Sequence, residues 1–265
     1  MKLLFEPISL FWKHRNLLYQ TTRNEIYARY AGSVLGLTWL IIYPLFFLGV
    51  YALIYLFVFK IRFGLFNSNE YVVVIFCGLI PFIGFAEALG LGVSSVTSNA
   101  NLIKNTFFPI ELIPVKAVLT SQCTQIVGTI LLMIAVVVLG KITLWALLLP
   151  IILLLQFLFT IGIIWILSSL NVYFRDLQNI ISVIILMLMM ISPIAYTADM
   201  VPANLRPILG FNPLYYIIIA HQDCLMLGRF PSGSIFWVLL IMSVLSFSGG
   251  YWFFTRMKKA FIDNV

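Results

Sequence analysis

Charged residues are scarce in this sequence. Asp, Glu, Lys and Arg together make up 9% of its 265 residues, against about 25% in soluble domains. Hydrophobic residues make up 62%, and a water-soluble fold has no interior large enough to hide so much apolar side chain. The composition therefore excludes a soluble globular protein and indicates that lipid is the solvent for most of the chain.

Cysteine and histidine are nearly absent, which restricts the chemistry open to the chain. The three cysteines are far apart and odd in number, so we interpret them as small buried hydrophobes. The two histidines, His14 and His221, fall on opposite predicted sides of the membrane, which excludes a metal cluster and a Ser-His-Asp triad. Between His221 and Asp223, a structural hydrogen bond is favoured over an active site. We expect no metal site and no catalytic residue.

A phosphate-binding loop is also missing. The pattern G-x-x-x-x-G-K-[ST] does not occur, because the one Gly-Lys pair, Gly140–Lys141, lacks the upstream glycine and the following Ser or Thr. The chain therefore cannot supply its own energy by this route. We expect it to bind no cofactor, with ATP and Mg²⁺ held by a separate subunit.

Long apolar runs fill the sequence instead, and they predict an all-α integral membrane protein. Most of the runs exceed the roughly 20 residues that a helix needs to cross about 30 Å of hydrocarbon. The fifth is short, and the second contains Pro81 and several glycines, so we expect both to be bent or tilted. The first thirty residues lack a continuous apolar core, so no cleavable signal peptide is expected. The six predicted spans are 35–59, 71–97, 117–139, 144–170, 179–195 and 233–255.

Lysine and arginine in the connections predict the orientation, because cytoplasmic loops carry an excess of both. With the N-terminus inside, eleven basic residues fall on the cytoplasmic side and five on the other, so both termini are predicted to be cytoplasmic. Basic residues beside anionic headgroups also explain the net charge of +7 without a nucleic-acid partner. The eleven are Lys2, Lys13, Arg15, Arg23, Arg29, Lys104, Lys116, Arg175, Arg256, Lys258 and Lys259; the five are Lys60, Arg62, Lys141, Arg206 and Arg229.

The N-terminal stretch, residues 1–30, precedes the first span and has an amphipathic pattern over residues 5–30. Arg15 and Leu17 do not fit this pattern, although a long arginine side chain can reach out to the interface. The pattern predicts a helix lying in the cytoplasmic interface, with an ordinary packing helix as the open alternative. Its predicted apolar face holds Ile8, Phe11, Trp12, Leu18, Tyr19, Thr22, Ile26 and Tyr30.

Two further segments are too broken by proline to span. The stretch SNANLIKNTFFPIELIPVK, residues 98–116, places Phe107 and Phe108 beside Lys104 on the cytoplasmic side. Exposed aromatic rings need a cover, which is either lipid or a partner protein. The second stretch, residues 192–231, has four prolines but is apolar at 214–220, so we expect a re-entrant hairpin of short helices on the outer side.

Two features inside the spans are candidates for a transport path. Glu87 is the one acid within a predicted span, where a charge is costly; it either lines a pore or packs helices as a paired or protonated group. The first span carries an aromatic residue at every fourth position, and phenol groups near mid-membrane need partners. Sugar hydroxyls or interhelical hydrogen bonds would both supply them. The aromatic residues are Trp39, Tyr43, Phe47, Tyr51, Tyr55 and Phe59.

Four stretches in this order resemble the permease subunit of type-2 ABC exporters, and most closely those that export lipid-linked polysaccharide such as O-antigen or capsule. They are RNEIYARYAGSVLGLTWLIIYPL (23–45), SNANLIKNTFFPIELIPV (98–115), NVYFRDLQNIISVI (171–184) and SPIAYTADMVP with FNPLYY (192–216). The resemblance covers nearly the whole chain. Ala31 departs from it, because members of that family often carry a second basic residue after the Arg-Tyr pair.

The resemblance implies an interfacial helix at 1–30, a transmembrane domain at 31–257 and a cytoplasmic tail at 258–265. It also implies a homodimer in the cytoplasmic (inner) membrane that binds two ATPase subunits and exports a lipid-linked polysaccharide. The segments 98–110 and 171–177 would couple the chain to the ATPases, and the aromatic stripe with Glu87 would contact sugar. Arg23 and Arg29 would meet the lipid pyrophosphate. The implied coupling residues are Lys104, Asn105, Phe107, Phe108, Pro109, Arg175 and Asp176.

Other functions stay open at this point. Permeases for teichoic acid share these motifs, and related type-2 permeases move drugs or small lipids. A membrane glycosyl or acyl transferase is less favoured, because the sequence shows no clustered acids and no His–Asp constellation at one surface.

Overall fold

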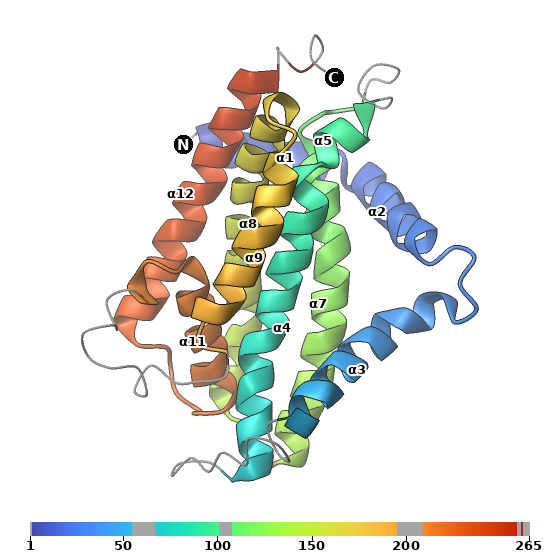
Figure 1. The fold of residues 1–265 in the computed structure, drawn as a ribbon. Coiled ribbons are helices and arrows are strands. Elements are labelled where there is room, and N and C mark those ends of the chain that lie inside the picture. The colour runs from blue at the N-terminus through green and yellow to red at the C-terminus, as the bar shows by residue number, and fades with distance from the viewer. Residues whose placement is uncertain (1, 55–66, 101–107, 195–208, 259–260, 262–265) are drawn as a thin grey trace.

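The computed structural model describes residues 2–54, 67–100, 108–194, 209–258 and 261 (Figure 1). Within these ranges the chain is helical and contains no strand, which confirms the predicted all-α class. The elements are α1 (Lys2–Lys13), α2 (Arg15–Arg29), η1 (Gly36–Thr38), α3 (Trp39–Leu53), α4 (Ser68–Val93), α5 (Ser95–Ser98), α7 (Leu112–Val138), η3 (Leu144–Leu148), α8 (Leu149–Tyr173), α9 (Leu177–Ile191), α11 (Pro213–Leu225) and α12 (Gly233–Met257).

Five helical stretches among the described residues are long and apolar enough to cross a membrane. They are Gly36–Leu53, Ser68–Val93, Leu112–Val138, Leu144–Tyr173 and Gly233–Met257, and each coincides with a predicted span. The predicted span at 179–195 coincides with α9, an apolar helix of 15 residues. At 1.5 Å per residue such a helix is shorter than the hydrocarbon core is thick. The chain is therefore a multi-span membrane protein, and the count of six spans stays a prediction.

The helices run alternately up and down. α4, α7 and α8 form the centre, α9 and α12 flank them, and α3 leans away from the bundle (Figure 1). One end of the bundle, at the top of Figure 1, holds α1, α5, the turn between α8 and α9, and the last turn of α12. The described residues of the two predicted coupling segments, 98–100 with 108–110 and 171–177, thus lie at one end of the molecule, beside the N-terminal helices.

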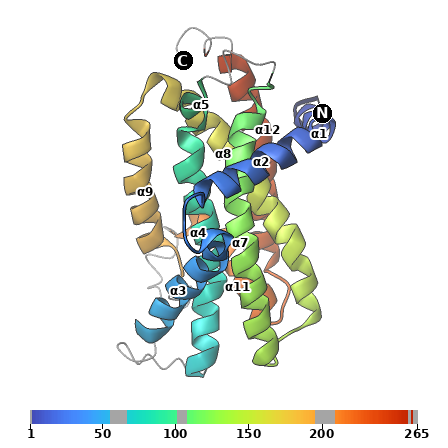
Figure 2. The same cartoon turned by 90° about the vertical axis from the view of Figure 1, so that its right-hand side faces the viewer.

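The N-terminal stretch forms two helices rather than the single one expected over 5–30. α1 and α2 are separated at His14, whose backbone is outside the helical range. Figure 2 shows α2 crossing α7 obliquely, so it does not run along the bundle. The predicted C-terminal tail, 258–265, also contains a packed residue, because Phe261 is buried and its ring centroid lies 5.2 Å from that of Phe254.

A chain of glutamine side chains joins the three central helices. Gln156 of α8 is fully buried, and its Nε2 donates to the carbonyl oxygen of Pro81 in α4 at 2.9 Å. Gln125 of α7 donates to Gln156 Oε1 at 2.8 Å, and Gln122 donates to Gln125 Oε1 at 3.1 Å. Buried amides need such partners, since an unpaired one is costly away from water. Three isolated glutamines within apolar runs were the only trace of this network in the sequence.

Close contacts between helices explain several glycines, including those of α4 that were expected to bend or tilt the second span. α4 is one continuous helix of 26 residues despite Pro81 and its glycines. A Cβ at Gly84 would overlap the Gln125 side chain, so this glycine makes room for α7. Gly250 of α12 lies against the Gly162 backbone of α8, and Gly162 lies against the Ser246 backbone of α12, so a Cβ at either glycine would overlap backbone atoms. Small residues are typical where membrane helices approach this closely.

Part of the predicted outer hairpin is visible as α11, a short helix packed against α4, α8 and α12. Asn212 begins it, because its side chain accepts a hydrogen bond from the Leu214 amide at 3.0 Å. Asn212 Nδ2 also donates to Ser192 Oγ at 2.9 Å, which ties the start of the predicted hairpin segment to the start of α11. Residues 195–208 lie outside the described ranges, so a re-entrant path stays a prediction.

His221 and Asp223 have separate structural partners in this helix. The His221 ring is 1% exposed and its Nδ1 bonds to the Ile217 carbonyl at 2.8 Å, while Asp223 pairs with Arg229 at 2.7 Å. Burial lowers the pKa of His221 to about 4. Burial raises the pKa of Asp223, and Arg229 opposes that rise. The interpretation of this pair as structural is consistent with these contacts.

Acid is therefore expected to weaken the fold through His221. The unfolded state takes up the proton near pH 6.5 and the folded state only near 4, so the contribution is complete above 6.5 and is lost as the pH falls towards 4. The free energy of unfolding should drop by up to about 1.4 kcal/mol per pH unit in this window. Thermal unfolding of the detergent-solubilised chain at several pH values measures the slope.

The variant His221→Gln should flatten that slope, and His14→Gln is the matched control that should keep it. Asp223 acts in the opposite direction, since a raised carboxyl pKa strengthens the fold as the pH falls through it. The two groups partly cancel at the acidic end of the range. A His221→Gln slope as steep as that of the unmodified chain would contradict the expectation.

Candidate functional site

A cavity of about 430 Å³ lies where α2, α3, α4 and α7 meet. One wall is aromatic and belongs to α3. The opposite side carries the acid of α4, and the end of α2 closes it. Its lining comprises Arg29, Tyr30, Trp39, Tyr43, Phe47, Phe82, Ile83, Ala86, Glu87 and Thr124.

An ion pair between Arg29 and Glu87 forms part of the wall of this cavity. The Arg29 guanidinium of α2 contacts the Glu87 carboxylate of α4, and the two side chains are 40% and 12% exposed. Thr124 Oγ1 of α7 lies 3.5 Å from the same carboxylate oxygen. A charge at this depth needs a partner, and Arg29 supplies it. Glu87 and Arg29 were expected in different roles, in the pore and at the headgroup, and the structure brings them into one site.

The aromatic stripe of the first span forms a ladder of rings along α3. The ring centroids of Tyr43 and Phe47 are 6.1 Å apart, and those of Phe47 and Tyr51 are 5.1 Å apart. Trp39, Tyr43 and Phe47 line the cavity with Glu87, whereas Tyr51 lies further along the helix. Tyr55 lies outside the described residues. Phe59 lies outside them as well, so three of the four described stripe residues share the cavity.

Arg23 was expected to act with Arg29, but the two face different hollows. Arg23 is exposed on α2 and its guanidinium lies 5.4 Å from the centre of the Tyr27 ring. It lines a groove on the other side of α2, together with Arg15. No lining residue is shared between this groove and the cavity of Arg29.

The second predicted coupling segment is tied to α5, the helix that leads into the first one. Asn171 Nδ2, in the last turn of α8, donates to Thr97 Oγ1 of α5 at 3.3 Å. Phe108 and Pro109 are half-buried, and Phe108 packs against the chain's own core. Less of the Phe108 ring is thus offered to a partner than the sequence suggested. Lys104, Asn105 and Phe107 lie outside the described residues.

The second predicted coupling segment, 171–177, also exposes an aromatic side chain, Phe174, which was not among the predicted coupling residues. Arg175 and Asp176 are exposed as expected, and Phe174 beside them is 68% exposed. A phenylalanine directly before a charged turn was the available signal. Exposed rings of this kind mark contact surfaces.

Comparison with known proteins agrees with this architecture. Residues 16–226 match the family described as ABC-2 type transporter. The chain belongs to this family. Three relatives are each named O-antigen export system permease protein RfbA. One from Myxococcus xanthus is 26% identical over 96% of this chain and 97% of its own length; two from Klebsiella pneumoniae are 31% identical (94% and 94%) and 33% identical (80% and 81%).

Membership of the ABC-2 transporters brings a membrane setting and an ATP-binding partner with it. The chain's own described residues hold no group of three or more His, Cys, Asp or Glu side chains that could bind a metal ion. The polar contacts within the end of the bundle that holds Asn99 and Asn171 connect several helices.

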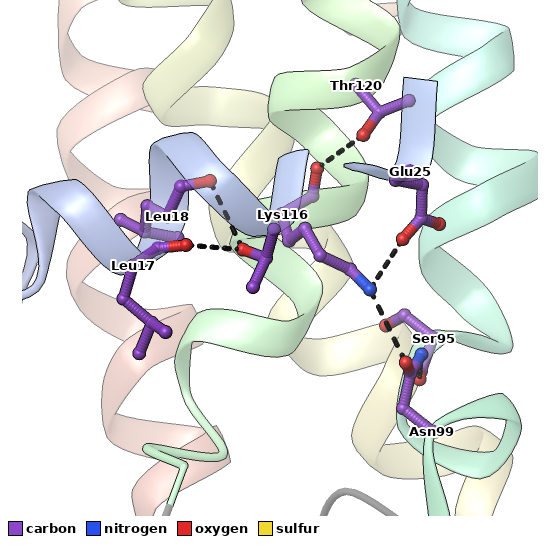
Figure 3. Close-up of polar contacts among 8 residues, drawn as sticks. Leu17, Leu18, Glu25, Ser95, Asn99, Lys116 and Thr120 are labelled. Atoms are coloured by element: carbon purple, nitrogen blue, oxygen red, sulfur yellow. Dashed lines mark hydrogen bonds and ion pairs between the residues drawn. The ribbon is translucent and has the colours of Figure 1, made fainter. Parts of the chain in front are cut away.

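Lys116 of α7 is the centre of these connections (Figure 3). Its Nζ lies 2.5 Å from Glu25 Oε2 of α2 and 3.4 Å from Asn99 Oδ1, directly after α5. Asn99 in turn donates to the Ser95 carbonyl at 2.7 Å. The Lys116 side chain is 9% exposed and that of Glu25 36%. One buried ammonium thus joins the N-terminal helix of this ABC-2 transporter to the start of the first coupling segment.

A second ion pair anchors the other end of that segment. Lys258, directly after α12, lies 2.5 Å from Glu111 Oε1, and the Trp165 indole of α8 donates to the Glu111 carbonyl at 3.0 Å. The residues on both sides of 101–107 are therefore held by the body of the bundle.

Removing the partner of Lys116 should destabilise the chain. Glu25→Gln leaves a largely buried ammonium without a carboxylate, which we expect to lower the free energy of unfolding by on the order of 1–3 kcal/mol. The double variant Glu25→Gln with Lys116→Met removes both charges and should recover most of that loss. Thermal unfolding in detergent measures all three proteins. Glu6 of α1 is exposed, so Glu6→Gln is the control. If Glu25→Gln and Glu6→Gln lower the free energy of unfolding equally, the Glu25–Lys116 pair contributes nothing to stability.

Proposed function

We propose that this chain is the membrane-spanning permease of an ATP-driven exporter that moves lipid-linked polysaccharide of the O-antigen type across the cytoplasmic membrane. The observation that carries the proposal is that three relatives, each aligned over 80% or more of this chain, bear the name of O-antigen export permeases. The family match and the multi-span helical fold support a transport role. Hydrolysis of ATP then belongs to a separate subunit, because the sequence has no phosphate-binding loop.

The Arg29–Glu87 cavity is the proposed meeting point with the cargo headgroup. A pyrophosphate carries more negative charge than one carboxylate and presents several acceptor oxygens to a guanidinium. It would therefore compete with Glu87 for Arg29. Displaced from Arg29, the Glu87 carboxylate still has the Thr124 hydroxyl beside it. The pair in this view holds the site closed until cargo arrives.

The aromatic wall beside the pair is the proposed sugar-contacting surface. Trp39 and Tyr43 are 38% and 50% exposed in the isolated chain, and both line the cavity. Sugar rings stack their apolar C–H faces on aromatic rings, while the phenol of Tyr43 can exchange hydrogen bonds with hydroxyl groups. Tyr51 lies one turn further along the same ladder and continues this surface.

The assembly is proposed to contain two copies of this chain and two ATPase subunits. The first span has little cover of its own, since 11% of its residues are buried, and a second copy would bury more of it. Both termini are proposed to be cytoplasmic, in agreement with the distribution of basic residues. The placement of α1 and the end of α12 at one end of the bundle supports this.

Neutralising Arg29 and Glu87 one at a time tests the headgroup site. Arg29→Gln should raise the cargo concentration that half-saturates ATPase stimulation by about tenfold, since a charge-assisted hydrogen bond contributes about 1.5–3 kcal/mol. Glu87→Gln should lower that concentration, because it frees Arg29. The measurement is ATPase activity of the reconstituted complex against lipid-linked cargo, with basal activity as the reference.

The exchanged pair Arg29→Glu with Glu87→Arg separates binding from packing. It restores an ion pair between α2 and α4 but moves the cation away from the end of α2. If the pair only packs helices, the exchange should restore both basal and stimulated activity. If Arg29 meets the pyrophosphate, basal activity returns and stimulation does not.

Co-purification tests the coupling segments. Phe174→Ala removes an exposed aromatic anchor, which typically contributes about 2 kcal/mol or more to an interface, so retention of the ATPase should fall by roughly thirtyfold. Phe108→Ala should mainly lower stability, because Phe108 packs against the chain's own core. Arg175→Ala is the control, since a rim charge has little effect at physiological salt. Loss of the ATPase with Phe108→Ala but not with Phe174→Ala would assign docking to the first segment alone.

A further inference from the structure

A second hollow lies under the N-terminal helices and has no place in the transport path described above. It is a groove of about 780 Å³ between α1 and α2 on one side and α3, α7 and α8 on the other. Its apolar walls include Phe11 and Leu18 of the N-terminal helices, Leu119 of α7 and Phe157 of α8. In a bilayer such a groove is filled by hydrocarbon chains rather than by water.

Two arginines give the groove a positive charge. Arg15 and Arg23 both line it, and no acidic residue does. The Arg15 guanidinium lies 5.0 Å from the centre of the Trp12 ring and donates one hydrogen bond to the Trp12 carbonyl at 3.0 Å, and Arg23 lies over Tyr27. Neither arginine forms an ion pair with any carboxylate in the described part of the chain. Each guanidinium has five N–H donors, so most of them remain open to an anion.

A third feature is an unpaired hydroxyl in the groove lining. Thr22 of α2 lines the groove, is 8% exposed, and its Oγ1 has no hydrogen-bond partner among the described residues. The preceding Thr21 is satisfied, because it donates to the Leu17 carbonyl at 2.8 Å. A buried hydroxyl without a partner is costly, so its presence in a groove lined by two arginines that pair with no described carboxylate indicates a polar ligand from outside the protein.

These three features match one class of ligand, an anionic lipid with apolar chains. We propose that the groove is a site for an anionic membrane phospholipid, whose phosphate lies between Arg15 and Arg23 near Thr22 and whose chains fill the apolar walls. Basic pockets between helices on the cytoplasmic side of membrane proteins bind lipid headgroups in this way. The lipid joins the N-terminal helices to α7 and α8.

The geometry favours a membrane phospholipid over the exported cargo. Neighbouring residues divide between the two hollows: Leu40 and Cys123 line the groove, whereas Trp39 and Thr124 line the Arg29 cavity. A molecule whose headgroup sits at Arg29 is therefore on the other face of α3 and α7. The inference needs only that the chain sits in a bilayer, so it stands apart from the proposed cargo.

Lipid-dependent stability tests the proposal. The full chain is placed in nanodiscs of phosphatidylcholine with a rising fraction of phosphatidylglycerol, and the midpoint of thermal unfolding is measured. A ligand that binds the folded state raises this midpoint as its concentration rises. The midpoint of the unmodified chain should rise and then saturate. The double variant Arg15→Gln with Arg23→Gln should require about 25-fold more of the anionic lipid, or roughly fivefold for each arginine.

Lys13→Gln is the matched control, because Lys13 is exposed on α1 and does not line the groove. It should behave as the unmodified chain does. A loss equal to that of the double variant would overturn the proposal in favour of general attraction to a negative surface. An unmodified midpoint that does not respond to phosphatidylglycerol would overturn it as well.

Thr22→Val provides a variant that keeps shape and folding. In pure phosphatidylcholine it should raise the midpoint, because it removes a buried unpaired hydroxyl. With phosphatidylglycerol its gain should shrink, since the lipid phosphate satisfies the hydroxyl in the unmodified chain. A gain that is the same at every lipid fraction would remove Thr22 from the site and overturn the proposal.

Mass spectrometry of the chain extracted with its lipids gives a measurement that does not depend on the arginine variants. Retained phosphatidylglycerol that Thr22→Val reduces and Lys13→Gln does not would support the site. Displacement of that lipid by a lipid-linked saccharide would assign the groove to the cargo instead and overturn the proposal.

Discussion

The structure depends on the lack of water in the bilayer core, which obliges every buried polar group to find a partner within the chain. Gln156 meets this demand with two partners, the Pro81 carbonyl of α4 and the Gln125 amide of α7. Because a hydrogen bond has strict geometry, these contacts fix how α4, α7 and α8 rotate against one another, which apolar contacts alone would leave open. The cavity inherits its shape from this arrangement, since Glu87 and Thr124 sit on two of the three helices.

The same demand holds the N-terminal helices in place. Glu25 and Arg29 are four residues apart on α2, a spacing at which a carboxylate and a guanidinium often pair along one helix. Here they point to different neighbours, Glu25 to Lys116 of α7 and Arg29 to Glu87 of α4. α2 is thus attached to the bundle by two ion pairs of opposite polarity. One of them borders the proposed cargo cavity and the other borders the first coupling segment, so a displacement of α2 affects both.

The sequence predicted the helical class and the positions of the long helices well, because hydrophobic length is a local property. It also predicted an aromatic stripe along the first span, three residues of which, Trp39, Tyr43 and Phe47, line one cavity. It did not predict the pairing of Arg29 with Glu87, since 58 positions separate them and only the packing of α2 on α4 brings them together. The glycines of α4 were expected to bend or tilt the span. The actual role of Gly84, which is to let α7 approach closely, depends on a neighbouring helix and cannot be read from the local sequence. The break at His14 had no clear local signal.

The backbone contact between Gly162 and Gly250 has a mechanical consequence. Two helices whose backbones interlock at one point cannot slide or roll past each other without a clash, so α8 and α12 behave as a single rigid post. Helix movements must then occur elsewhere in the molecule. α3 leans away from the bundle and α9 presents Val183, Met187 and Met190 outward, so neither has a comparable lock in the described chain. Motion during a transport cycle would be concentrated in these two helices, with the α8–α12 post as the fixed frame against which they turn.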